Sequence, residues 1–259
     1  MFKTEVSVVM KDGKVEITPI SDIHYGNNNC KLHKVQRLID YLTPREHNYW
    51  YILGDIFDCI LSSDKRASAE DKAESIFRSR RKIMQMFDPI KDRCLGWGDG
   101  NHEAKLEKEN VGSPCRDIAE EWGVPYLGYS GFLRIKPTES IAKRRCPILY
   151  YHHGASAGRK TGGSINRVEE LAQYWGADFY NVAHAHKLWT TSEVFVDWTG
   201  VYKKVFAMTG TYLETCTIGQ TGYGEIAQYP PQDLGCITNV WKILGEGKSS
   251  FSAHITEVT

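Results

Sequence analysis

Five short β-type runs in this chain each end in side chains that commonly ligate metals. The residues that follow these runs are Asp22 and His24, Asp55 and Asp58, Asn101, His152 and His153, and His184 and His186. In open α/β sheets, ligands lie beyond the carboxyl ends of the strands. The repeated arrangement therefore predicts that several strands deliver these side chains to one metal site. The predicted site contains more candidate ligands than one metal ion needs.

The spacing within these segments suits convergence on a metal. Gly54 and Gly100 stand shortly before the candidate ligands Asp55 and Asn101, and glycine lets the backbone turn sharply. Mixed nitrogen and oxygen ligands suit Mn, Fe, Zn or Ni better than Mg or Ca. Two such ions about 3.5–4 Å apart can clamp a phosphate and activate a water molecule. The residues therefore indicate hydrolysis of a phosphoester, with Mn the first candidate metal.

Strand-like and helix-like patterns alternate in the first part of the chain. Strands are predicted at Val15–Ile20, Tyr49–Leu53 and Arg93–Trp97, with helices at Leu32–Leu42 and Asp64–Phe87 between them. This alternation is typical of parallel strands joined by helical crossovers. It predicts an α/β fold whose candidate ligands lie at one edge of a parallel sheet.

The sequence predicts mainly β-strands at both ends of the chain. An Asp12-Gly13 step between Glu5–Met10 and Val15–Ile20 predicts a β-hairpin. Residues 188–259 contain several further strand-like runs and are expected to complete a second sheet. The length of 259 residues and a hydrophobic content of 41% then fit a single domain spanning 1–259.

The charge balance argues against a general attraction to nucleic acid or membranes. Lysine plus arginine and aspartate plus glutamate each number 32, so the formal net charge is zero. A local basic groove remains compatible with this balance. Arg159 and Lys160 are candidates for substrate contact because their loop directly follows a ligand-bearing strand. The cluster Arg78–Lys82 is a weaker candidate, because a solvated helix face explains it.

Cysteine usage and hydropathy indicate an intracellular protein. The seven cysteines are scattered and include no C-x-x-C pair, which indicates reduced thiols. The N-terminus lacks a signal-peptide pattern, and no apolar run approaches membrane-spanning length. We therefore expect a soluble, cytoplasmic protein that does not engage a membrane.

The ordered set of motifs resembles the calcineurin-like metallophosphoesterase family. All five occur in the family order and span Asp22 to His186, about two thirds of the chain. The motifs are Asp22-Ile-His24, Gly54-Asp55-Ile-Phe-Asp58, Gly100-Asn101-His102-Glu103, His152-His153-Gly154 and His184-Ala-His186. The resemblance implies a four-layer αββα fold, in which helices flank a two-sheet β-sandwich. It also implies a site for two metal ions.

The same resemblance implies how the ligands are shared. Asp22, His24 and His186 would hold one ion. Asn101, one histidine of the His152-His153 pair and His184 would hold the other. Asp55 would bridge them. His152 is preferred over His153, because the apolar strand ends just before it and family members usually place the ligand there.

Three other residues receive supporting or catalytic roles from the resemblance. His102 would be the catalytic imidazole, which contacts the phosphoryl oxygen or protonates the leaving group. Glu103 would orient His102, and Asp58 would support a ligand without binding metal.

The departures from the motifs bear on the substrate. Asp58 is followed by Cys59-Ile60 rather than Arg-Gly, which argues against the protein Ser/Thr phosphatases of the family. The Gly-Asp-Ile-Phe-Asp segment is similar to that of DNA-repair nucleases and nucleotide-lipid pyrophosphohydrolases. The Gly-rich segment Thr161–Arg167 resembles that of phage and bacterial members. We therefore expect a phosphodiesterase acting on nucleic acid or a nucleotide, with a small-molecule phosphomonoesterase as the alternative. An inactive metal-binding scaffold is a third interpretation, against which the intact His102 argues.

Overall fold

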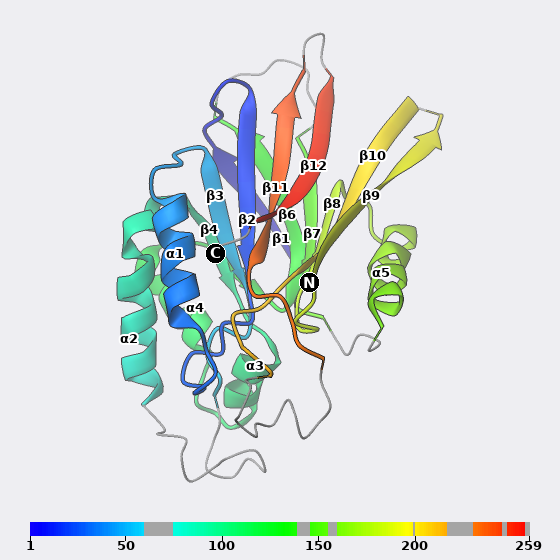
Figure 1. The fold of residues 1–259 in the computed structure, drawn as a ribbon. Coiled ribbons are helices and arrows are strands. Elements are labelled where there is room, and N and C mark those ends of the chain that lie inside the picture. The colour runs from blue at the N-terminus through cyan, green and yellow to red at the C-terminus, as the bar shows by residue number, and fades with distance from the viewer. Residues whose placement is uncertain are drawn as a thin grey trace.

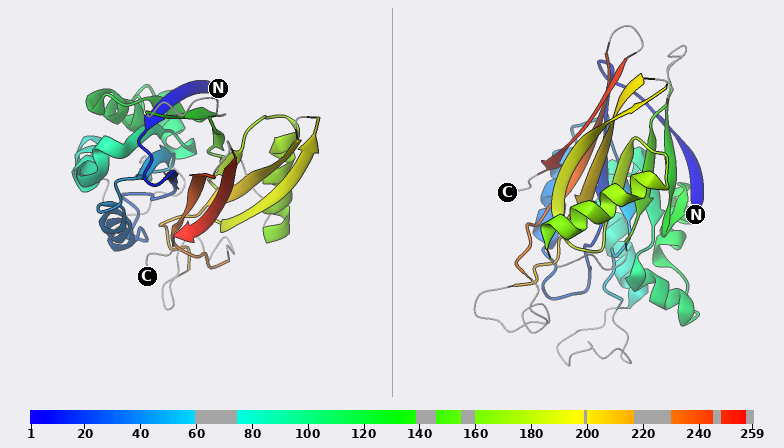
Figure 2. Two further views of the ribbon diagram at one scale, coloured as in Figure 1. Left: turned by 90° about the horizontal axis from the view of Figure 1, so that it is seen from above. Right: turned by 90° about the vertical axis from the view of Figure 1, so that its right-hand side faces the viewer.

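Two six-stranded sheets lie face to face, and helices cover both outer faces (Figure 1). The computed structural model describes residues 1–59, 75–138, 146–154, 160–198, 200–216, 230–244 and 248–256. The view from above shows helices grouped on opposite sides of the paired sheets (Figure 2). This arrangement confirms the helix-flanked two-sheet sandwich predicted from the sequence. Among the described residues, no helix is long and apolar enough to cross a membrane.

The two sheets have different strand orders. The first runs β1-β6-β7-β8-β10-β9 and the second runs β12-β11-β2-β3-β4-β5. The strands of the first are β1 (Phe2–Val8), β6 (Ser130–Pro137), β7 (Ile148–His152), β8 (Phe179–Val182), β9 (Leu188–Asp197) and β10 (Gly200–Thr209). Those of the second are β2 (Lys14–Ile20), β3 (Asn48–Leu53), β4 (Cys94–Gly98), β5 (Tyr126–Gly128), β11 (Cys236–Ile243) and β12 (Ser249–Thr256). Strands β2, β3 and β4 pair in parallel, as the strand–helix alternation predicts.

The strands at both ends of the chain are distributed differently from the prediction. The predicted hairpin is wrong, because β1 pairs with β6 in the first sheet while β2 pairs with β3 in the second. The turn at Lys11–Lys14 forms, but it leads the chain from one sheet to the other. Val8 and Val15 on either side of it both enter the core between the sheets. The C-terminal strands are also divided, since β9 and β10 join the first sheet and β11 and β12 join the second.

The helices form the two outer layers and one end of the sandwich. Those beside the second sheet are α1 (Leu32–Leu42), α2 (Ile76–Phe87) with the 3₁₀ helix η1 (Asp88–Arg93), and α4 (Pro114–Trp122) (Figure 1). Helix α5 (Thr161–Glu170) and the 3₁₀ helix η2 (Leu171–Gln173) lie on the first sheet. The short helix α3 (Asn101–Lys108) follows β4 directly, at the end of the sandwich. The predicted helix from Asp64 lies outside the described residues as far as residue 74.

An aromatic cluster fixes the helices on the second sheet. Trp50 of β3 and Trp97 of β4 are fully buried and meet edge to face, with ring centroids 6.0 Å apart. Trp122 of α4 packs against both rings. Helix α4 begins after Ser113, whose side chain accepts from the Arg116 amide, and Gly123 ends the helix in the left-handed conformation. This packing holds the ends of β3 and β4 side by side.

Candidate metal centre

Polar side chains from both sheets converge at one end of the sandwich. They follow β2, β3 and β4 of the second sheet and β7 and β8 of the first. Within the described residues, three groups have candidate ligand atoms that all lie within 4.8 Å of one another. The groups are Asp22, His24 and His186; Asp55, His153 and His184; and His24, Asp58 and His102.

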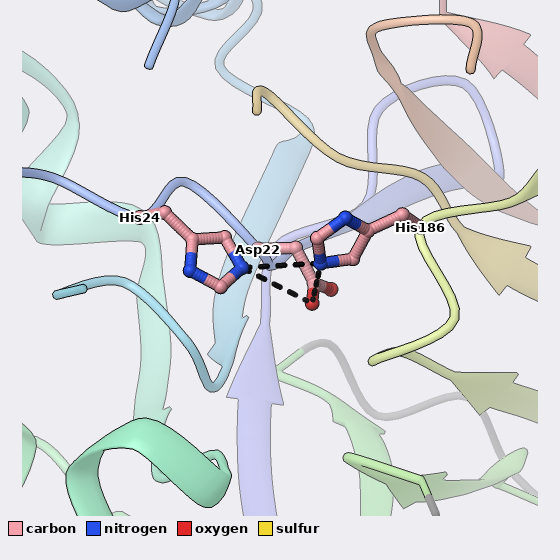
Figure 3. A group of neighbouring side chains, drawn as sticks. All are labelled: Asp22, His24 and His186. Atoms are coloured by element: carbon pink, nitrogen blue, oxygen red, sulfur yellow. Dashed lines mark hydrogen bonds and ion pairs between the residues drawn. The ribbon is translucent and has the colours of Figure 1, made fainter. Parts of the chain in front are cut away.

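The first group points three ligand atoms at one position (Figure 3). The Nε2 atoms of His24 and His186 are 3.1 Å apart. Asp22 Oδ1 lies 3.2 Å from His186 Nε2 and 3.9 Å from His24 Nε2. Among the described residues, Asp22 Oδ1 has no hydrogen-bond partner although it is buried, which is costly for a carboxylate oxygen. A cation bound among these three atoms would remove that cost.

The second group is built around His153. Its Nε2 lies 3.1 Å from Asp55 Oδ2 and 3.2 Å from Asn101 Oδ1. Its Nδ1 lies 2.7 Å from the Leu53 carbonyl oxygen, which can only accept, so Nδ1 carries a proton and Nε2 faces the group. His184 contributes a buried Nδ1 atom that has no hydrogen-bond partner in the described part of the chain. Like the first group, this group therefore contains a buried candidate ligand atom without a hydrogen bond.

The geometry favours His153 as the ligand, where the sequence analysis preferred His152. Strand β7 continues through His152, so alternation places this side chain on the same face as Tyr150. The His152 ring stacks near Tyr150, and its Nδ1 accepts from the Gly154 amide at 2.6 Å. The first residue beyond the strand is His153, which turns toward Asp55. The strand is one residue longer than predicted, and this reverses the roles of the two histidines.

Unusual backbone conformations bring the candidate ligands together. Asp22, His24, Asp55, His184 and His186 all have positive φ angles, between 51° and 73°. Such angles cost energy for residues other than glycine and occur mainly at functional sites. The chain therefore turns sharply at each of these positions after its strand ends.

Two glycines permit the close approach of the loops. A Cβ atom on Gly54 would lie 2.3 Å from the Gly100 amide nitrogen. One on Gly100 would lie 2.1 Å from Asp55 Oδ1 and 2.6 Å from His153 Cε1. Any side chain at either position would push these groups apart, so the sequence prediction of sharp turns here has a direct steric basis.

Asp58 holds two imidazoles. Its Oδ1 lies 3.2 Å from His24 Nδ1, and its backbone carbonyl contacts His102 Nδ1. Asn27 donates to its Oδ2 at 3.2 Å. Because a carbonyl only accepts, His102 Nδ1 carries a proton, and this contact leaves Nε2 for another partner. Burial, followed by the nearby His24, lowers the pKa of His102 to about 4.

Glu103 does not orient His102, contrary to expectation. Its two oxygens accept hydrogen bonds of 2.8 to 3.0 Å from backbone amides at both ends of the site. The donors are the amides of Asp55, Ile56, Phe57 and Gly100. Burial, Asp55 and Asp99 together raise the pKa of Glu103 to about 7. Glu103 thus ties the turn after β3 to the start of α3, while the Asp58 carbonyl orients His102.

Electrostatics favour positive charge between Asp55 and His153. Burial opposes the charged form of both groups, but their mutual attraction outweighs it. It holds the pKa of Asp55 well below its usual range and raises that of His153 to about 10. A metal ion that binds His153 Nε2 would take the place of this proton and meet the same carboxylate.

The expected substrate contacts are less well defined. Arg159 lies outside the described residues, and Lys160 is exposed at the start of α5. On α2, Arg78 is exposed, whereas Arg80 pairs with Asp117 at 2.9 Å. Among the residues that the structure describes, the metal-type side chains come together without a lysine or arginine between them.

Several supporting residues carry no motif that sequence reasoning could have found. The Thr211 hydroxyl and the Tyr212 amide donate to the Asp22 carbonyl at 2.8 and 2.9 Å. The Tyr129 hydroxyl donates to the Gly154 carbonyl at 2.6 Å, and its ring packs edge-on against His153. These contacts join segments far apart in the sequence, so no local spacing reveals them.

The chain belongs to the calcineurin-like phosphoesterase family, whose model matches residues 16–222. This match covers every strand end that contributes to the site. Members of the family are generally metal-dependent hydrolases, and some are inactive. No curated protein matches the sequence.

Solved structures similar to this fold include two proteins of low sequence identity. Vps29 of Chaetomium thermophilum is 8% identical, with a TM-score of 0.38, over 93% of this chain and 95% of its own. GAP50 of Plasmodium, described as the anchor in the inner membrane complex, is 8% identical with a TM-score of 0.44, over 95% of this chain and 85% of its own.

Glu103→Gln should destabilise the fold by about 2–4 kcal/mol. The amide group would turn an NH₂ toward backbone donors that now share two carboxylate oxygens, and would leave buried amides unsatisfied. Glu107→Gln is the matched control, because Glu107 lies on the same helix but is partly exposed and pairs with Arg116. It should change stability by at most about 0.5 kcal/mol. Urea denaturation measures both, and equal effects would contradict the role given to Glu103.

Proposed function

We propose that this protein hydrolyses phosphodiesters at a site that holds two metal ions. The observation that supports this most directly is the pair of adjacent ligand groups, each with a buried ligand atom that accepts no hydrogen bond from the described residues. Those atoms are Asp22 Oδ1 in one group and His184 Nδ1 in the other. A single ion would satisfy only one group.

The ligand assignment follows the two groups. Asp22, His24 and His186 would hold the first ion, and Asn101, His153 and His184 the second. Asp55 would bridge them, since its Oδ2 faces His153 and its charge also acts on His24. This mixture of imidazole, carboxylate and amide donors suits Mn first, with Fe, Zn and Ni as alternatives.

Bound ions would supply the charge that holds phosphoryl oxygens and the acidity that makes water a nucleophile. The water oxygen would bond to phosphorus as the bond to the leaving oxygen breaks, without a covalent enzyme intermediate. His102 would contact a phosphoryl oxygen or pass a proton to the leaving oxygen through Nε2. Asp58 would hold the His102 and His24 rings in place for this step.

The preference for a phosphodiester rests on the sequence around Asp55 and on the departure from the phosphatase motif at Cys59. A nucleic-acid substrate would need local cations, because the net charge of the chain is zero. Exposed Arg78 and Lys160 are the described candidates for such contacts. Binding to DNA through them would weaken steeply with added salt.

His153→Ala should remove one metal ion, whereas His152→Ala should leave the metal content unchanged. The reason is that His153 Nε2 faces Asp55 and Asn101, while His152 turns toward Tyr150. Elemental analysis of both purified variants, with folding checked by circular dichroism, measures the difference. Loss of an ion from His152→Ala alone would reverse the assignment.

His102→Ala should slow turnover by roughly a hundredfold or more while both ions remain bound. If the imidazole donates a proton, substrates with poor leaving groups should lose more than p-nitrophenyl esters. The assay would compare bis-p-nitrophenyl phosphate, p-nitrophenyl phosphate, and single- and double-stranded DNA, with metal content measured in parallel.

The outcomes of this assay separate the candidate functions. Faster turnover of the monoester would favour a phosphomonoesterase. Wild-type protein that binds two ions but hydrolyses none of these substrates with Mn, Fe, Zn, Ni or Co would favour a scaffold. A fall in turnover that only follows metal loss would make His102 a structural residue.

A further inference from the structure

The β9–β10 hairpin extends the first sheet away from the metal centre. Strands β9 and β10 are each ten residues long and pair in an unbroken antiparallel register from Leu188 to Asp197. Figure 1 shows the hairpin leaving the sandwich at the end opposite α3 and diverging from β11 and β12. The metal centre lies at the α3 end, so the tip of the hairpin is remote from it.

Four large apolar side chains are exposed on this hairpin. Val194, Val196 and Val201 are 67%, 75% and 73% exposed, and Trp198 at the turn is 102% exposed. Val196 is the register partner of Val201, so alternation places the three valines on one face. That face also contains Val205, which is buried between the sheets. The hairpin therefore continues the apolar interior face into solvent, which is typical of an interaction site.

Strand β9 is the longest of the sheet edges. The two sheets end in β1, β9, β5 and β12. Strand β5 has three residues, and β1 carries Glu5 in ion pairs with Arg134 and Lys136. Strand β12 has eight residues and exposes Ser252, His254 and Ile255.

Strand β9 has ten residues, and it contains no proline or lysine and no bulge against β10. In the described part of the chain, its one strand partner is β10. A long regular edge of this kind offers its outer backbone groups to another strand.

We propose that β9 pairs antiparallel with β9 of a second copy of this chain, forming a two-fold dimer with one continuous sheet. A two-fold interface brings the same surface of both copies together, so each backbone donor on one edge meets the matching acceptor on the other. The chain has no net charge that would keep copies apart. The inference is independent of the proposed hydrolysis.

The position of the exposed residues on β9, within 192–197, and the charges of the strand together select the register. A two-fold axis at Phe195 would place Glu193 opposite Asp197 of the second copy, and like charges directly opposite are destabilising. An axis at Val196 would overlap only the last residues of the strand. An axis at Val194 sets this valine against itself and Ser192 against Val196, with seven paired residues from Thr191 to Asp197. It also sets Glu193 against Phe195, so no like charges face each other.

Cysteine cross-linking tests the register. Val194→Cys should form an intermolecular disulfide under mild oxidation, because residues paired across a two-fold axis lie within the Cα separation of about 4.4–6.8 Å that a disulfide requires. Val201→Cys is the matched control, since Val201 is similarly exposed on the same face but lies in β10. Its two copies would be about 20 Å apart, because they are separated by three strand spacings across the sheet and by four residues along it. The native cysteines are the same in both variants, and non-reducing electrophoresis reads the result.

Analytical ultracentrifugation tests the dimer itself. The wild type should sediment as a dimer at micromolar concentration. Val194→Lys should weaken association roughly a hundredfold or more by setting two charges against each other, while Val201→Lys should remain dimeric. Both positions are exposed, so folding should be preserved, and circular dichroism verifies it.

Three results would overturn the proposal. One is a monomeric wild type at high micromolar concentration. Another is a dimer that survives Val194→Lys, because its interface would lie elsewhere. The last is equal loss of the dimer, or equal cross-linking, in the Val194 and Val201 variants, which would indicate packing through the hairpin face.

Discussion

The candidate metal centre depends on one buried carboxylate that accepts several backbone hydrogen bonds. Glu103 receives the amides of Asp55, Ile56 and Phe57 after β3, and that of Gly100 before α3. These bonds compensate for burying the charge and hold two strand ends in fixed relation. Asp55 in turn accepts from the His102 amide at 2.9 Å. One side chain thereby positions the central carboxylate and the candidate catalytic imidazole together.

The centre also requires both sheets of the sandwich. Asp22, Asp55 and Asn101 come from the second sheet, whereas His153, His184 and His186 come from the first. Neither sheet alone supplies the group of Asp22, His24 and His186 or the group of Asp55, His153 and His184. The core between the sheets, which includes Tyr51 and Tyr151, therefore fixes the geometry of the site as well as the stability of the fold.

Much of this arrangement could be predicted from local sequence patterns. The alternation of strands and helices predicted the parallel β2-β3-β4 unit, and the order of the motifs predicted the family. The errors concern where a strand ends and which sheet it joins. Strand β7 is one residue longer than predicted, and for this reason the geometry favours His153 over His152 as the ligand. Val8 and Val15 pack between the sheets, so the chain passes from one sheet to the other at the Asp-Gly turn instead of forming a hairpin. The role of Glu103 depends on backbone amides, which have no sequence signature.

The central claim is that the two ligand groups hold two ions that share Asp55. Elemental analysis of the wild type after metal reconstitution and of Asp55→Asn tests it most directly. The account predicts two ions per wild-type chain and weakened binding of both in the variant, because one carboxylate serves both groups. Two ions retained at wild-type affinity in Asp55→Asn, with the fold intact, would contradict it.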